Sequence, residues 1–183
     1  MKKISQSIAR AATLFVLVAV VFVLFALMRV IVYGPTDTVS NFAECAEEGN
    51  SVVGSYPAQC ITSSGKMFVE DIGNELDKQD FIRIDIPRPN SVVASPLVIE
   101  GEARGTWFFE GDFPVQLLDG DGREVAVGFV SSNEEWMTEA FIPYYGELVF
   151  EIPNTTTGTL ILKKDNPTGL PEHDDTLYIP VRF

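Results

Sequence analysis

An uninterrupted apolar stretch near the N-terminus limits what this chain can fold into more than any other feature. From Ala11 to Met28 the sequence contains no charged residue, and beyond Arg29 the apolar character continues to Tyr33. An α-helix rises about 1.5 Å per residue, so roughly 20 residues cross a hydrocarbon core of about 30 Å. Residues 1–33 are therefore predicted to form a cytoplasmic tip and a transmembrane signal anchor.

Positive charges before this stretch predict its orientation. Lys2, Lys3 and Arg10 precede it, and the positive-inside rule keeps such a terminus in the cytoplasm and sends the rest of the chain out. A cleaved signal peptide is the alternative, but its apolar part spans about 7 to 15 residues and ends at a small-x-small site. The stretch here is longer, and MRVIVYGP at its exit offers no such site. We therefore expect a single-pass membrane protein whose C-terminal domain lies outside, in the extracellular space or the periplasm.

The charge of the exported part excludes one large class of partners. All 26 acidic residues follow Tyr33, together with only nine Lys and Arg residues, which gives that part a net charge of −17. Nucleic-acid binders concentrate basic residues on one face, so we expect no nucleic-acid partner. Anionic lipid headgroups attract polybasic segments, so a second membrane contact through the acidic part is not expected either.

The two cysteines of the chain, Cys45 and Cys60, lie close together in a short segment. The polar residues 34–41 read as a linker, and residues 42–72 as a small Cys-closed segment. In an oxidising compartment such a pair most often forms a disulfide, which stabilises a loop of this size by about 3 kcal/mol. A zinc site lacks further ligands nearby, and a catalytic thiol lacks a neighbouring histidine, because His173 is the only one. We therefore predict a Cys45–Cys60 disulfide.

Residues 81–183 show short apolar runs broken at regular intervals by turn residues, a pattern typical of a β-sandwich or barrel. IRIDI and LVIEGEA alternate apolar and charged residues, as antiparallel sheets with one wet face do. Residues 73–80 before them are polar and read as a linker or a short turn of helix. The predicted strands are Ile82–Ile86, Leu97–Ala103, Phe113–Leu118, Glu124–Val130, Glu139–Ile142, Glu147–Ile152, Thr159–Lys163 and Thr176–Val181.

Two groups of residues resemble known motifs of exported bacterial proteins. The cysteine segment resembles a small two-Cys motif through Cys45, Gly49, Ser55-Tyr56-Pro57, Cys60, Gly65 and Phe68-Val69-Glu70. Residues 81–183 resemble the Gmad2 family, an immunoglobulin-like domain of bacterial spore germination proteins, through Ser95-Pro96-Leu97, Gly101, Phe109-Glu110-Gly111, Asp119-Gly120-Asp121-Gly122, Trp136 and Ile179-Pro180-Val181. The second resemblance implies an all-β fold, an immunoglobulin-like antiparallel β-sandwich without known catalysis. The germination role is not carried over, since fold-level analogy does not fix function.

Motifs that carry chemistry are absent from the sequence or have simpler explanations. LDGDGREV places Asp119 and Asp121 two apart, but no EF-hand frame fits, and a hairpin turn accounts for the two glycines. EHDD surrounds His173 with carboxylates in a Gly- and Pro-rich loop, which an acidic surface loop explains without a metal. No G-x-S-x-G nucleophile pattern occurs. We expect no catalytic, cofactor-binding or metal-binding residues.

Aromatic residues offer the remaining candidates for a binding surface. We expect Phe109 and Trp136 to lie in the core, since aromatics of sandwich proteins mostly fill it. Trp107, Tyr144 and Tyr145 stand in predicted loops or at strand ends, and form the candidate contact surface.

The sequence therefore favours a non-enzymatic binding or structural module of the bacterial cell envelope. It predicts a cytoplasmic membrane protein that engages an envelope protein or polysaccharide through loops and sheet edges. A hydrolase of envelope polymers is one alternative, weakened by the single histidine. An accessory subunit of a membrane complex is another.

Overall fold

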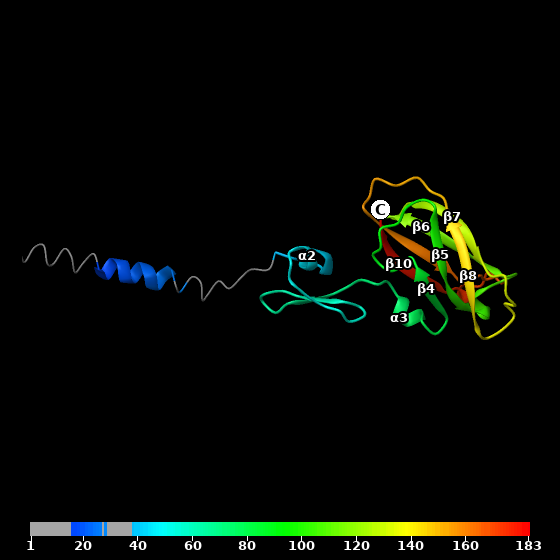
Figure 1. Ribbon diagram of the computed structural model, residues 1–183, viewed down its shortest axis with the longest axis horizontal. Coiled ribbons are helices and arrows are strands. Elements are labelled where there is room, and N and C mark those ends of the chain that lie inside the picture. The colour runs from blue at the N-terminus through cyan, green and yellow to red at the C-terminus, as the bar shows by residue number, and fades with distance from the viewer. Residues whose placement is uncertain (1–15, 27, 29–37) are drawn as a thin grey trace, which may run out of the picture. The chain divides into compact units, whose positions relative to one another are not determined.

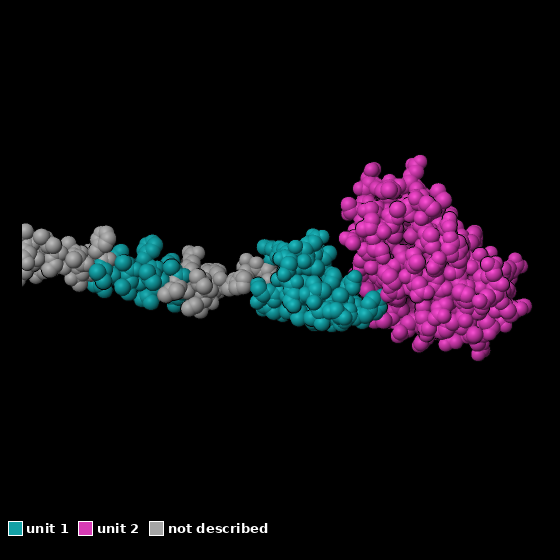
Figure 2. All heavy atoms as spheres, viewed as in Figure 1, with its two compact units in different colours: residues 1–70 teal, residues 71–183 magenta. Residues whose placement is uncertain are grey.

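The computed structural model describes residues 16–26, 28 and 38–183 (Figure 1). The chain divides into two compact units, residues 1–70 and residues 71–183, which Figure 2 shows in different colours. Residues 16–26 and Met28 are helical with exposed side chains, and the other residues of the predicted anchor lie outside the described residues. Within the described ranges, no helix has the length and apolar character needed to cross a membrane.

Residues 38–70 of the first unit form a short helix and a three-stranded antiparallel sheet of order β1-β2-β3. Its elements are α2 (Phe42–Glu47), β1 (Ser51–Val53), β2 (Gln59–Ile61) and β3 (Met67–Val69). Asn41 caps the helix, because its side chain accepts a hydrogen bond from the Glu44 amide at 2.9 Å. A disulfide joins Cys45 of α2 to Cys60 of β2, as the sequence predicted. With Val39, these cysteines form the small core of the unit.

The second unit contains seven strands and three short helical segments. The strands are β4 (Ile82–Ile86), β5 (Leu97–Arg104), β6 (Asp112–Asp119), β7 (Glu124–Ser131), β8 (Phe141–Leu148), β9 (Thr157–Lys163) and β10 (Thr176–Arg182). The helical segments are α3 (Glu75–Lys78) and the 3₁₀ turns η1 (Gly105–Trp107) and η2 (Pro171–His173).

The sheet order β10-β9-β6-β7-β8-β5-β4 folds into two facing halves. Strands β7 and β8 share a single ladder pair, Ser131 with Tyr145, whereas every other neighbouring pair shares at least four. The sheet therefore turns a corner there, with β10-β9-β6-β7 on one side and β8-β5-β4 on the other (Figure 1). Residues of all seven strands enter one hydrophobic cluster, which is the core of an antiparallel sandwich.

The chain also crosses between the halves after β4. The Val93 amide donates to the Arg182 carbonyl at 2.8 Å, and the Arg182 amide donates to the Ser91 carbonyl at 2.9 Å. A parallel bridge joins Val92 to Arg182. This segment covers the outer edge of β10, which would otherwise present unpaired backbone groups.

The structure corrects one pair of predicted strands. Glu139–Ile142 and Glu147–Ile152 were predicted as separate strands with PYYG as a breaker, but one strand, β8, runs through PYYG. Its side chains alternate, with Tyr144 and Gly146 facing inward. Residues 73–80 include the short helix α3, and the second unit begins at Asp71.

Candidate functional site

Three loops meet at the end of the sandwich where β5, β7 and β9 finish. We call residues 105–111, 132–140 and 164–175 together the loop end. The Gly105 amide donates to the Ala140 carbonyl at 3.3 Å, which ties the first loop to the second. The Asp165 amide donates to the Trp107 carbonyl at 3.0 Å, which ties the third loop to the first. Backbone hydrogen bonds therefore hold the loops at fixed positions relative to one another.

Gly105 allows the second loop to approach the first. A Cβ atom at this position would lie 2.0 Å from the Trp136 carbonyl oxygen and 2.1 Å from that of Thr138. The Thr138 amide donates to the Trp136 carbonyl at 2.7 Å, so this backbone is already folded tightly. The Arg104 guanidinium donates to the Glu139 carbonyl at 2.7 Å. Any other residue at position 105 would displace the segment that carries Trp136.

A tight turn places an aromatic pair at the surface. Phe109 and Asp112 exchange backbone hydrogen bonds of 3.0 and 3.2 Å across Glu110 and Gly111. Both central residues have positive φ, 54° and 87°, as a type I′ turn requires. A Cβ at Gly111 would lie 3.4 Å from Cδ1 of the Trp136 indole. Trp136 also meets the Phe109 ring edge to face, with centroids 6.4 Å apart.

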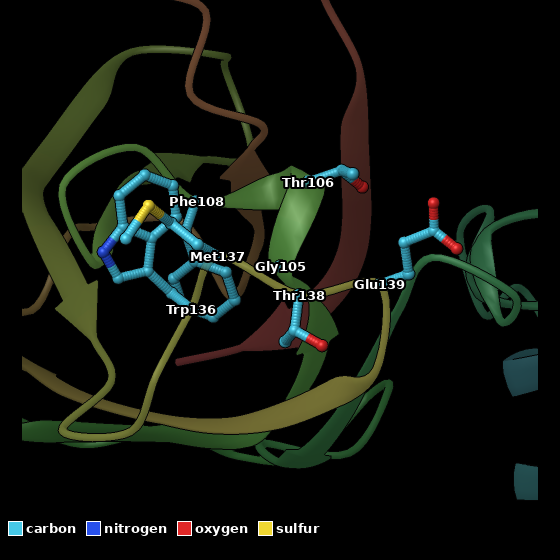
Figure 3. A pocket seen from close by; sticks show the side chains of 7 residues that line it. All are labelled: Gly105, Thr106, Phe108, Trp136, Met137, Thr138 and Glu139. Atoms are coloured by element: carbon cyan, nitrogen blue, oxygen red, sulfur yellow. The ribbon is translucent and has the colours of Figure 1, made fainter.

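The loop end has an open, shallow hollow of about 380 Å³ at its surface. Figure 3 shows the residues that line it, which are Gly105, Thr106, Phe108, Trp136, Met137, Thr138 and Glu139. Its apolar part consists of Phe108, Trp136 and Met137, whose side chains are grouped together in this view. Phe108 is buried, Trp136 is half-buried, and Met137 is 72% exposed. The hollow can hold an apolar or flat group against an indole.

Carboxylates outnumber cations at the loop end, where Lys164 is the only Lys or Arg residue. Glu110, Glu134, Glu135 and Glu139 are all exposed. None of them forms an ion pair within the part of the chain that the structure describes. One oxygen of Glu135 accepts a hydrogen bond from the Met137 amide at 3.1 Å. The loop end is therefore an apolar hollow in a strongly negative surrounding.

Asp165 shows the effect of this negative field. The pKa of its carboxyl is raised, first because partial burial disfavours the charged form. The negative charge of Asp112 raises this pKa further, the hydrogen bond from the Asn166 amide lowers it, and the charge of Glu110 adds a smaller increase. Acidic groups of β6 and of the first loop thus act on a carboxyl of the third loop.

Two of the three predicted contact residues are in the core, which corrects that prediction. Trp107 is 2% exposed and Tyr144 is 3% exposed. The Tyr144 hydroxyl donates to the Arg83 carbonyl at 2.9 Å, and it reaches this oxygen because Gly101 between them has no side chain. Burial raises the pKa of Tyr144 well above its usual value, and the charges of nearby carboxylates add to this. Neither residue can contact a partner at the surface.

The other aromatic residues also lie at places that differ from the prediction. Tyr145 is 48% exposed, as expected of a contact residue, but it lies on the outer face of β8 and its hydroxyl donates to Glu147. Phe109 and Trp136 were expected in the core. Phe109 is instead 40% exposed, while Trp136 is half-buried and packs against the core.

The two acidic motifs have structural roles. Asp119 to Gly122 forms the β6–β7 hairpin turn, with φ of 78° at Gly122, as predicted. In the second motif, Nδ1 of His173 is hydrogen-bonded to the Thr168 hydroxyl at 2.9 Å. Among the described residues, no group of three or more His, Cys, Asp and Glu side chains is arranged to hold a metal ion.

A second hollow of about 280 Å³ lies over β6, β7 and β9 and is the competing site. Its apolar wall includes Val127 and Phe129, which are 60% and 63% exposed. Lys163 and Glu124 line it as well, so it has charges of both signs. It lacks the loops and the uncompensated charge that distinguish the loop end, which is therefore the stronger candidate.

Comparison with known families agrees with the resemblance seen in the sequence. Residues 81–169 match the model of the Gmad2 family, described as the immunoglobulin-like domain of bacterial spore germination. The predicted resemblance is therefore confirmed for these residues. Neither a curated protein nor a solved structure matches the chain significantly.

Proposed function

We propose that this chain is a membrane-anchored, extracytoplasmic binding module of the bacterial cell envelope. The match of residues 81–169 to the immunoglobulin-like Gmad2 domain supports this proposal. The loop end is the binding surface of the module, and an envelope protein or polysaccharide is its partner. The observation that carries the proposal is the apolar hollow at Trp136 and Met137, held in place by backbone hydrogen bonds. Binding residues commonly lie on loops that a rigid scaffold positions.

The proposed location has separate support. The apolar stretch from Ala11 to Tyr33 is long enough to span a bilayer. The Cys45–Cys60 disulfide favours an oxidising compartment. To test this, intact cells would be treated with a membrane-impermeant maleimide, with and without reductant. Labelling only after reduction, together with retention of the chain in membranes washed with carbonate, is expected. Labelling of free thiols without reductant would contradict an exported, oxidised segment.

The proposed binding surface is tested by cross-linking in living cells. A photoreactive amino acid would replace Met137, which is exposed at the rim of the hollow. A matched chain would carry it at Glu151, which is exposed and follows β8 at the opposite end of the strand from Met137. A discrete adduct from position 137 that is absent from position 151 is expected. Equal adducts from both positions, or none from position 137, would refute the loop end as the binding surface.

A further inference from the structure

We propose that the loop end binds a cationic peptide segment of a partner protein, with one lysine or arginine side chain seated in the hollow against Trp136. This inference rests on the proposed function and names the chemistry of its partner. It follows from three observations: the charge around the hollow, the shape and composition of the hollow, and a contrast with the aromatic residues that already have cations.

The charge around the hollow selects the sign of the partner. Glu110, Glu134, Glu135 and Glu139 are exposed and have no ion pair among the described residues. Unpaired like charges on neighbouring loops repel one another, and a cationic partner converts this repulsion into attraction. An anionic polymer would be repelled, and a neutral sugar would leave the four carboxylates without a role. The charge is therefore complementary to lysine and arginine.

The hollow suits the stem of such a side chain as well as its charged group. A volume of about 380 Å³ is enough for one long side chain and some water. Phe108 and Met137 offer apolar surface to the methylene groups, and methionine adapts its shape to what it contacts. The Trp136 ring attracts a cation placed over its face. Glu139 also lines the hollow, and in Figure 3 its side chain points away from Trp136, so its carboxylate adds to the negative field without pairing directly with that cation.

Elsewhere in the same domain, the chain supplies cations to its own aromatic ring. The guanidinium carbon atoms of Arg83 and Arg104 lie 4.1 and 4.6 Å from the centroid of the Phe141 ring. No cation of the described residues lies over Trp136, although indole is the best aromatic acceptor for one. The Phe141 ring therefore has its cations within the fold. The Trp136 ring and the four unpaired carboxylates of the loop end have none within the described part of the chain, and we assign them to a partner.

The test measures peptide binding to the full chain in detergent micelles by fluorescence anisotropy. The probe is a labelled 12-residue peptide in which lysine, leucine and glycine alternate. The same peptide with glutamate in place of lysine and a neutral chitin tetramer in competition are the comparison probes. The cationic peptide is expected to bind, and raising the salt from about 0.05 M to about 0.5 M is expected to weaken this binding about tenfold.

Variants locate the binding. The triple change Glu110→Gln, Glu135→Gln and Glu139→Gln is expected to weaken binding about tenfold or more, since it removes charge and keeps size. The matched control is Glu100→Gln, Glu124→Gln and Glu151→Gln, which removes the same charge away from the loop end and is expected to change binding less than about twofold. Trp136→Ala is expected to weaken binding about tenfold, and Trp136→Phe, which keeps an aromatic ring in the fold, by a smaller factor. Thermal unfolding of each variant verifies its fold.

Three outcomes would overturn the inference. They are failure of the cationic peptide to bind, equal losses from the two triple variants, and preference for the chitin tetramer or the acidic peptide. The cross-link at position 137 then separates the two claims. If that adduct persists, the loop end still binds a partner of other chemistry. If it is absent as well, the proposed function also fails.

Discussion

The two compact units of this protein are stabilised by different means. The first has a core of Val39, Cys45 and Cys60, and two of these three residues are joined covalently. The second has no cysteine, and all seven of its strands contribute to one core cluster. The first unit is too small to bury much apolar surface, so a cross-link replaces packing there. The second has enough strands to enclose a core, and packing suffices.

The surfaces of the two units reflect this difference. In the first unit, Val53, Ile61, Met67 and Val69 share one face of the three-stranded sheet and are between 36% and 54% exposed. A single small sheet has a second face with nothing packed on it. In the second unit, the facing halves bury their inner side chains almost completely. Four predictions test this contrast, in order of decreasing expected effect.

The largest effect is expected from Phe113→Ala in the packed unit. Phe113 is fully buried and contacts the rings of Trp107, Phe108 and Tyr144 at centroid distances of 6.4, 5.0 and 5.1 Å. Its removal leaves a cavity and should lower the free energy of unfolding by about 3 to 5 kcal/mol. Urea unfolding of the full chain, followed by tryptophan fluorescence, measures this, because both tryptophans lie in the second unit.

Phe129→Ala is the matched control for that prediction. Phe129 lies on the outer face of β7 and is 63% exposed. The same truncation there should cost less than about 1 kcal/mol, since little apolar area leaves the core. Similar losses from both variants would show that packing does not dominate this unit.

Removing the disulfide should affect only the first unit. The chain-entropy cost of a loop of this size predicts a loss of about 3 kcal/mol for the double change Cys45→Ser and Cys60→Ser. With so small a core, residues 38–70 are expected to unfold while the sandwich stays folded. Hydrogen exchange of the full chain, read peptide by peptide, should show lost protection in that range alone. Full protection of residues 38–70 in the variant would mean that packing holds this unit too.

Glu110→Asn should stabilise the sandwich. Glu110 adopts a left-handed conformation with φ of 54° at the first central position of a type I′ turn. The left-handed conformation costs most residues with a Cβ about 1 kcal/mol, whereas asparagine is favoured at this turn position. The melting temperature should therefore rise, while binding of the cationic peptide weakens because a carboxylate is lost. An unchanged or lower melting temperature would contradict the assignment of strain to this residue.

The smallest effect is expected from Asp165→Asn, and it should depend on pH. The folded-state pKa of Asp165 is raised, so the protonated form is favoured by folding, and stability falls as the pH rises through that pKa. The variant should therefore be slightly more stable than the natural chain at pH 7, by at most about 0.5 kcal/mol for a position near the surface. This advantage should vanish below 3.8, the ordinary pKa of aspartate. Thermal unfolding of the variant and the natural chain at pH 7 and at a pH below 3.8 measures the difference in stability. An equal difference at the two pH values would refute the electrostatic cause.

Much of the fold could be predicted because its signals are local. The alternation in IRIDI and LVIEGEA predicted β4 and β5, and the DGDG turn predicted the β6–β7 hairpin. The disulfide followed from the number and spacing of the cysteines. The error at β8 arose because PYYG has the composition of a turn, although its residues continue the alternation of the strand.

The candidate site was harder to predict than the strands. Trp136 and Met137 stand in a charged, irregular stretch, NEEWMTE, with no periodicity to say which side chain faces inward. The only available signal was an apolar pair among acidic residues between two predicted strands. The hollow itself depends on Gly105, whose missing side chain admits the backbone of the second loop.

The sequence alone determined most of the strands, the cross-link and the acidic character of residues 34–183, because these depend on neighbours in the chain and on composition. Only the tertiary structure decided which aromatic residues are buried. Tyr144 lies inside because its hydroxyl finds the carbonyl of Arg83, 61 residues away, across Gly101. Trp136 reaches the surface of the loop end because three loops are fixed by strands distant in sequence. Burial is a property of such long-range contacts, and no local pattern contains them.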